Sequence, residues 1–259
     1  DKGWASSISV GGVGVILSVL LIMFFLVYVV APLFMPASVK EHASYALPGG
    51  SQEKTLFYGM DEYKETAMRI TESGKLIGFN ANNGQLLTES SLPLNGESIT
   101  SFARVKESDK LIAFGLSGGG VLLAKYGYKV TYPDNVRKIT PALTFPFGQE
   151  PLVVADQPIS KVAARSSDSQ LVVAYQLAGQ SHVFVKQYDK VESMLSDDVA
   201  LEEYAEGEVP NNMPVDWLMM GGNMRNLYLV SEDGSTLYYD LSNIREPVLL
   251  QKVNMVNGG

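Results

Sequence analysis

A long uncharged stretch near the N-terminus constrains this chain more than any other feature of its sequence. No charged residue occurs between Lys2 and Lys40, and the most apolar part of this gap covers residues 10–30. A helix rises about 1.5 Å per residue, so this part matches a hydrocarbon core of roughly 30 Å. The sequence therefore predicts one transmembrane anchor helix with its flanks in residues 1–36 and a separate domain in residues 37–259.

The residues that flank the stretch are typical of a membrane anchor. Trp4 and Tyr28 lie near its opposite ends, where amphipathic rings favour the headgroup region, and Pro32 ends the helix. A cleaved signal peptide and a buried core helix are the alternatives, but the apolar region of a signal peptide is shorter, about 7–15 residues. We expect the N-terminus in the cytoplasm and the larger domain outside.

The composition excludes several classes of function. The chain has 28 Asp and Glu against 20 Lys and Arg, a formal net charge of −8, and no cysteine. The acidic balance disfavours nucleic-acid partners, and the lack of thiols excludes disulfides, thiolate zinc sites and iron–sulfur clusters from this chain. Since His42 and His182 are the two histidines, this chain alone cannot assemble a His-rich metal site.

Beyond Lys40 the sequence favours β structure, because short alternating or β-branched runs recur between Gly, Asn, Asp and Ser. Three stretches share one spacing, in which an apolar residue opens a strand and the next apolar run begins 12 residues later. A turn and a third strand follow in each. The three pairs are Ile99 and Leu111, Ile159 and Leu171, and Val215 and Leu227. A fourth, irregular copy has a strand at 75–79 and an Asn83-Gly84 hairpin signal.

These repeats predict a mainly β domain of the WD40-like, β-propeller type, because each small sheet needs a neighbour to cover its face. The copies are unevenly spaced, so insertions interrupt any regular blade period. Extra strands are expected at 54–58, 128–132, 152–155 and 248–253. With these strands the domain would have about five blades. We expect that so few blades do not close the propeller ring. A β-sandwich is the alternative.

The insertion at residues 192–208 contains seven acidic residues. Ser196 is expected to cap a short helix with Asp197 and Asp198 in its first turn, and Gly207 to end it. We interpret this segment as a solvated helix on a loop. A docking site for a basic partner, or a loose cation site, is the alternative.

One catalytic pattern occurs in the chain. Residues 115–119, Gly-Leu-Ser-Gly-Gly, match the G-x-S-x-G nucleophile elbow of α/β-hydrolases. That elbow needs a helix after the serine, whereas a third glycine and a predicted strand at 121–124 follow Ser117. We therefore expect a glycine-rich hairpin. The nominal base, His182, lies in an alternating strand and is expected to be an ordinary surface or packed side chain.

Other chemical motifs are weaker or absent. Residues 231–235 resemble a calcium loop only in their Asp-Gly pair, and a hairpin turn is expected there. The sequence contains no phosphate-binding G-x-x-x-x-G-K-[ST] motif and no H-E-x-x-H motif. We therefore expect that the chain is not an enzyme, and the sequence predicts no catalytic, cofactor-binding or metal-ligating residues.

The N-terminal segment resembles a transporter helix. Residues 8–16, Ile-Ser-Val-Gly-Gly-Val-Gly-Val-Ile, and the run from Phe24 to Phe34 are similar to the first membrane helix of the enlarged permease subunit of proteobacterial phosphate ABC transporters. In that family a large periplasmic β-rich domain follows the first helix. The resemblance covers the anchor, and the repeat region only in general character. It implies a bacterial inner-membrane protein with the large domain in the periplasm.

The resemblance also implies that this chain is the N-terminal part of a permease for inorganic phosphate. Its periplasmic domain would then contact partners, not catalyse a reaction. The implied partners are a second permease, the ATPase through regions outside this chain, and the periplasmic phosphate-binding protein. No phosphate-binding residue is carried over. The alternative is a single-pass, membrane-anchored periplasmic β-propeller that acts as a scaffold in envelope assembly.

Overall fold

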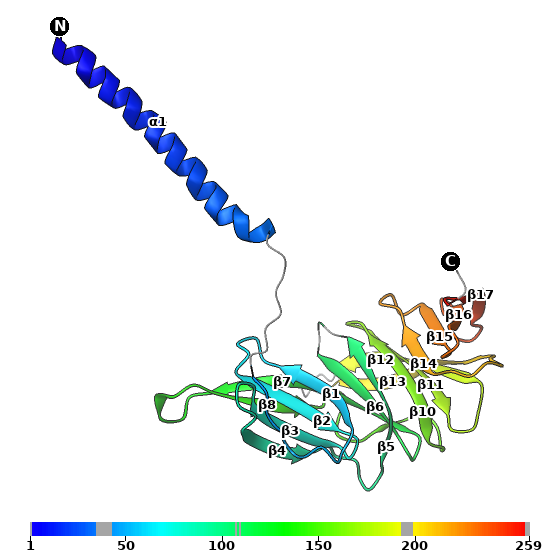
Figure 1. The fold of residues 1–259 in the computed structure, drawn as a ribbon. Helices are drawn as coiled ribbons and strands as arrows, with labels where there is room; N and C mark the ends of the chain where they lie inside the picture. The colour runs from blue at the N-terminus through cyan, green and yellow to red at the C-terminus, as the bar shows by residue number, and fades with distance from the viewer. Residues whose placement is uncertain (1, 35–42, 107, 109, 193–198, 257–259) are drawn as a thin grey trace. The chain divides into compact units, whose positions relative to one another are not determined.

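The chain forms two compact units, Asp1–Ser44 and Tyr45–Gly259. The computed structural model describes residues 2–34, 43–106, 108, 110–192 and 199–256 (Figure 1). In the first unit, helix α1 (Lys2–Val30) continues into the short 3-10 helix η1 (Ala31–Phe34).

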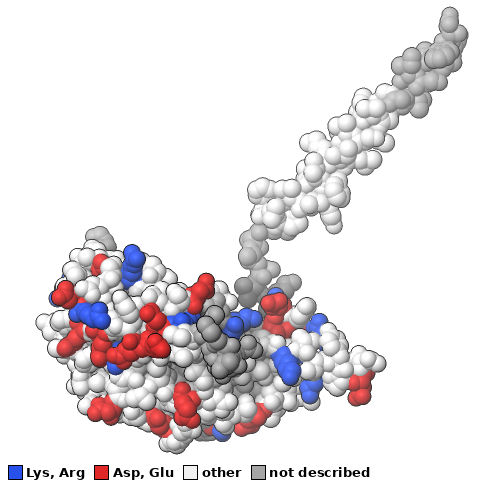
Figure 2. Space-filling view, turned by 180° about the vertical axis from the view of Figure 1, so that it is seen from behind, with Lys and Arg blue, Asp and Glu red and all other residues white. Residues whose placement is uncertain are grey.

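The apolar helix has the length and composition needed to cross a membrane. Residues 12–34 have a peak mean hydropathy of 3.0, and none of that window is buried by the protein. The Ser18 hydroxyl donates a hydrogen bond of 2.9 Å to the Gly14 carbonyl, so this polar group is satisfied within the helix, as an apolar environment requires. Membrane anchors and signal sequences both have helices of this kind. Figure 2 shows no charged side chain along the part of the helix that is drawn in white.

The second unit consists of four antiparallel sheets, each a meander in chain order. Sheet A contains β1 (Thr55–Met60), β2 (Thr66–Thr71), β3 (Lys75–Asn80) and β4 (Leu86–Ser91). Sheet B contains β5 (Ile99–Lys106), β6 (Leu111–Leu116), β7 (Gly120–Thr131) and β8 (Lys138–Thr144), with β9 (Leu152–Val153) paired to β7. Sheet C contains β10 (Ile159–Ser166), β11 (Gln170–Leu177), β12 (Val183–Glu192) and β13 (Val199–Val209). Sheet D contains β14 (Trp217–Met220), β15 (Asn226–Val230), β16 (Ser235–Asp240) and β17 (Val248–Asn254).

Neighbouring sheets pack face to face in the order A, B, C, D, and one apolar cluster fills each interface. Sheet B illustrates why its strands are apolar on both faces. In β6, Ile112 and Phe114 belong to the cluster shared with sheet A, whereas Leu111 and Ala113 belong to the cluster shared with sheet C. Side chains alternate between the faces of a strand, so a continuous apolar run marks a strand that is covered on both sides.

The prediction of a mainly β, propeller-like repeat domain after one apolar helix is confirmed. Ile99 opens β5 and Leu111 opens β6, so the 12-residue spacing marks the first two strands of a sheet. The count of about five blades is wrong for the described residues, which form four sheets. The extra segments are strands of these same sheets. They contribute β1, the end of β7, β9 and β17.

The helix expected to end at Gly207 is not observed. Ser196 and the two aspartates after it lie outside the described residues, and the following segment is the edge strand β13, paired with β12. Ala205, Gly207 and Val209 are buried, and the glutamates between them are exposed. This period of two is that of a strand with one covered face, and it outweighs the capping signal.

Residues 45–54 cover the face of sheet A that points away from sheet B, and we call them the strap. The fully buried Arg69 of β2 fastens the strap to the sheet. Its guanidinium donates hydrogen bonds to the carbonyls of Pro48 (2.9 Å), Gly50 (2.6 Å) and Glu53 (2.6 Å). The planar fork of an arginine satisfies several acceptors at once, which a lysine cannot do in this geometry.

A second contact holds the end of the strap. The Glu53 carboxylate accepts a hydrogen bond of 2.6 Å from Ser73 Oγ and pairs with Lys75 Nζ at 2.9 Å. Hydrogen bonds from Ser73, Lys75 and Thr71 lower the pKa of Glu53 to about 2. Glu53 therefore stays ionised in mildly acidic solution, and the ion pair persists there.

We predict that Arg69→Met lowers the free energy of unfolding of the β domain by about 3 kcal/mol, because several strap carbonyls lose their donor. The matched control is Arg137→Met. Arg137 pairs at the surface with Glu65 at 2.8 Å, and its loss should cost far less stability, because solvent screens an exposed ion pair. Urea unfolding of the detergent-solubilised chain, followed by tryptophan fluorescence, measures both. Equal effects of the two substitutions would show that the strap does not depend on Arg69.

Candidate functional site

A cleft with mostly apolar lining residues lies where sheets B and C meet, within the described part of the chain. The segment after β8 folds back so that β9 pairs with the start of β7, and Val153 lies opposite Gly120. The amides of Val154 and Ala155 donate hydrogen bonds of 3.1 and 3.0 Å to the Gly119 carbonyl, and Tyr175 donates one of 3.0 Å to the Val154 carbonyl. These bonds attach the segment to both sheets and leave a hollow beside β7.

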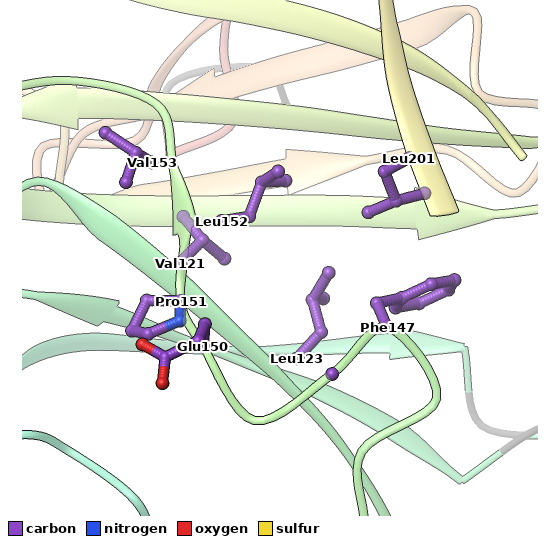
Figure 3. Close-up of a pocket in the computed structure, with 9 residues that line it drawn as sticks. Val121, Leu123, Phe147, Glu150, Pro151, Leu152, Val153 and Leu201 are labelled. Carbon is purple, nitrogen blue, oxygen red and sulfur yellow. The ribbon is translucent and has the colours of Figure 1, made fainter. Parts of the chain in front are cut away.

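The walls of this cleft are mostly aliphatic and aromatic (Figure 3). Its volume is about 250 Å³. Sites for drug-sized ligands are larger, about 300–1,000 Å³, so the cleft fits one or two amino-acid side chains. Its lining residues are Val121, Leu123, Phe147, Gly148, Glu150, Pro151, Leu152, Val153 and Leu201.

The polar groups around the cleft hold its walls and form no reactive set. Glu150, the one titratable residue of the lining, accepts a hydrogen bond of 3.0 Å from the Asn95 amide. Lys190 Nζ lies 5.3 Å from the centre of the Phe147 ring, a cation–π contact that keeps this ring in place. Burial raises the pKa of Tyr175, so its hydroxyl remains a neutral donor to the wall. The lining thus offers apolar contact without a nucleophile and its base.

The G-x-S-x-G segment does not form a nucleophile elbow. Ser117 lies in the turn between β6 and β7, and a strand follows it, as the hairpin interpretation predicts. Its Oγ accepts a hydrogen bond of 3.1 Å from the Ser98 amide, and the Gly118 amide donates one of 2.6 Å to the Glu97 carboxylate. These contacts shape a turn, and they position the carbonyl of Gly119 for the segment that forms the cleft.

His182 lies apart from this turn, directly before β12 of sheet C, where it pairs with Glu208 of β13. Both side chains are about half exposed. His182 also borders an open hollow of about 520 Å³ between sheets C and D, together with Tyr239 and Lys252. The lining of this hollow contains no Ser, Thr or Cys, so the nominal base has no nucleophile beside it.

The segment that resembles a calcium loop is a hairpin turn, as expected. Ser231 and Ser235 pair across it, and Asp233 accepts a hydrogen bond of 2.8 Å from the Ser235 amide. This bond and the Ser235 hydroxyl lower the pKa of Asp233, so the carboxylate serves the turn itself. Within the described ranges, no group of three or more His, Asp or Glu side chains is placed to hold a metal ion.

The acidic insertion presents its charges on the exposed edge strand β13. Lys186 Nζ lies 3.0 Å from Glu203 and 3.6 Å from Glu206, so one partly buried ammonium balances two carboxylates. Glu202 and Glu208 add further acidic side chains to this strand. Charges along an edge strand also discourage pairing with foreign strands, which is the ordinary role of such a pattern.

The sequence did not identify the cleft. Its residues come from β7, from the turn at 145–148, from β9 and from the distant strand β13. Phe145-Pro146-Phe147-Gly148 marks a turn with two unusually apolar residues. That apolar turn was the one available signal, because the pairing of β9 with β7 depends on tertiary contacts.

Comparisons with known proteins bear on the fold alone. No protein-family model matches the chain, and no curated protein matches it significantly. Among solved structures, the WD40 domain of Pan2 from Neurospora crassa matches with 14% identity and a TM-score of 0.39. The match covers 78% of this chain and 50% of that domain, so this chain spans about half the length of the structure it matches.

We predict that Gly119→Ala destabilises the domain by about 3 kcal/mol and disturbs the cleft. Gly119 has a φ of +90°, and an added Cβ would lie against the Ala155 carbonyl, well inside van der Waals contact. Gly96 is the matched control, because its φ is +88° and nothing lies within 4 Å of the added atom. Gly96→Ala should cost about 1 kcal/mol, the backbone part alone. Thermal melts of both variants test the difference, which would vanish if the contact with Ala155 were loose.

Proposed function

We propose that this chain is a membrane-anchored, propeller-like interaction domain, and that the cleft between sheets B and C receives an apolar side chain of a protein partner. The observation that carries the proposal is the lining of the cleft, which offers Phe147, Leu152 and Leu201 but no catalytic pair. Apolar pockets of this size suit the buried anchor residues that dominate protein interfaces. The helix at residues 12–34 supports attachment of the domain to a membrane.

We further propose that the domain belongs to the permease subunit of a bacterial phosphate ABC transporter. The support is the resemblance of residues 8–16 and 24–34 to the first helix of that subunit, together with the β-rich domain that follows it. In this role the β domain lies in the periplasm of an inner-membrane protein. The partner at the cleft is then the periplasmic phosphate-binding protein, and the membrane, the second permease and the ATPase complete the assembly.

A single-pass periplasmic scaffold in envelope assembly is the second candidate. The observation that supports it is the apolar helix at residues 12–34, which is long enough to attach the domain to a membrane. The two candidates share the interaction domain and differ in whether phosphate uptake depends on it.

The experiment compares two valine-to-aspartate substitutions in the intact gene at its own locus. Val153 lines the cleft and is 75% exposed, so Val153→Asp places a charge at the mouth with little cost to folding. Val136 is 65% exposed and outside the cleft lining, and Val136→Asp is the matched control.

We predict that deletion of the gene abolishes high-affinity phosphate uptake, that Val153→Asp reduces uptake at least 5-fold, and that Val136→Asp leaves it unchanged. Uptake of radioactive phosphate by phosphate-starved cells is the measurement, with immunoblots to verify equal protein levels. Normal uptake after deletion would exclude the permease. Reduced uptake with equal effects of the two aspartates would exclude the cleft as the contact site.

A further inference from the structure

Sheet D differs from sheets B and C in the cover of its two faces. One face joins the cluster shared with sheet C through Leu218, Leu229 and Leu237. The opposite face carries Trp217 and Met219, which are 52% and 49% exposed. Sheets B and C, by contrast, contribute side chains to apolar clusters on both of their faces.

The strand register arranges the uncovered face of sheet D into two uncharged rows. The central row crosses the sheet through Met219, Tyr228, Tyr238 and Gln251, and the adjacent row through Trp217, Val230, Thr236 and Val253. None of these eight side chains is charged, although the chain as a whole has a net charge of −8. The next row of this face contains Asp240, so the uncharged patch is limited to these two rows, in which Thr236 is buried and Trp217 and Met219 are about half exposed. An uncharged patch with half-exposed aromatic and aliphatic side chains is typical of a surface that another element covers.

The centre of this face repeats a feature that is covered elsewhere in the domain. Tyr228 and Tyr238 stack across β15 and β16, with ring centroids 4.9 Å apart and an interplanar angle of 11°. Tyr175 and Phe184 stack in the same way across β11 and β12, at 5.7 Å and 26°. That second pair packs into the cluster between sheets B and C. The outer face of sheet D and the face of sheet C toward sheet B therefore carry the same kind of stacked aromatic pair. Another sheet packs on the pair of sheet C, and no described sheet packs on the pair of sheet D.

At the other end of the series of sheets, the strap covers the centre of the outer face of sheet A. The outer face of sheet A carries Ala67, Ile77 and Phe79, and Tyr45 of the strap meets Phe79 edge to face at 6.3 Å. With Arg69 fastening the strap, the outer side chains of β2 and β3 are covered, whereas Tyr58 and Met60 on β1 stay exposed. The described residues place no comparable strap over the central strands of sheet D.

We propose that the outer face of sheet D is a further sheet-to-sheet interface, occupied by another antiparallel sheet of the same polypeptide. The argument is continuity, because the three established interfaces all join the face of one sheet to the face of the next. The occupant would present an uncharged aliphatic face to Met219, Tyr228 and Tyr238. The choice of the same polypeptide rests on the proposed function, in which this domain is part of a larger permease.

The chain contains no cysteine, so a single introduced thiol reports one position. Met219→Cys probes the face, and Met60→Cys is the matched control, because Met60 is 56% exposed and lies on β1. Both variants are made in the full polypeptide expressed from its own gene. Spheroplasts are then treated with a polyethylene-glycol maleimide, which adds a visible mass to each labelled molecule.

We expect the thiol at position 219 to react at least 10-fold more slowly than the thiol at position 60. Equal rates would overturn the proposal, because the face would then be open. A cysteine-linked photo-crosslinker at position 219 identifies the cover. The expected product is an internal link that leaves the mass of the polypeptide unchanged, and mass spectrometry locates it in a segment with strand alternation.

Other products would overturn the proposal. A link of doubled mass would show that a second copy covers the face, and a link to another protein would show a separate partner. Phosphate uptake is measured in the same cells, so loss of the proposed function and exposure of this face are scored independently.

Discussion

The fold depends on burial of one sheet face against the next. A meander of four short strands has two faces, and no single sheet can remove both from water. Sheets B and C lie between neighbours that cover both of their faces, and the strap held by Arg69 covers the centre of the outer face of sheet A. The apolar residues on both faces of β6 and β11 follow from this requirement, because each strand of an inner sheet contacts two clusters.

Local sequence patterns predicted the strands of the repeat units but not the tertiary contacts between distant segments. The spacing from Ile99 to Leu111 marks two strands and the turn between them, which are set by neighbouring residues. The acidic segment that ends in β13 carries both a capping signal and a two-residue alternation, and pairing with β12 decided between them. The sequence around Arg69 did not predict that this side chain is buried, because its partners are main-chain carbonyls of the strap. Such acceptors have no signature in a sequence.

The cleft illustrates the same limit for function. Sequence motifs directed attention to Ser117 and His182, and the structure places them on different sheets in ordinary roles. The cleft instead arises because β9 returns to β7 and brings Phe147 close to Leu201. Its chemistry is apolar contact, which suits recognition. Together with the helix of membrane-spanning length, this lining supports the proposal that the domain is a recognition module held at a membrane.

The central claim is that the apolar helix keeps the β domain attached to a membrane, with the domain on the outer side. Extraction of cell membranes with alkaline carbonate, followed by detection of the β domain with an antibody, tests it directly. The account predicts that the domain stays in the membrane pellet, and that protease added to intact spheroplasts degrades it. Release of the domain into the carbonate supernatant would contradict the anchor, and resistance to protease until the cells are lysed would contradict the outward orientation.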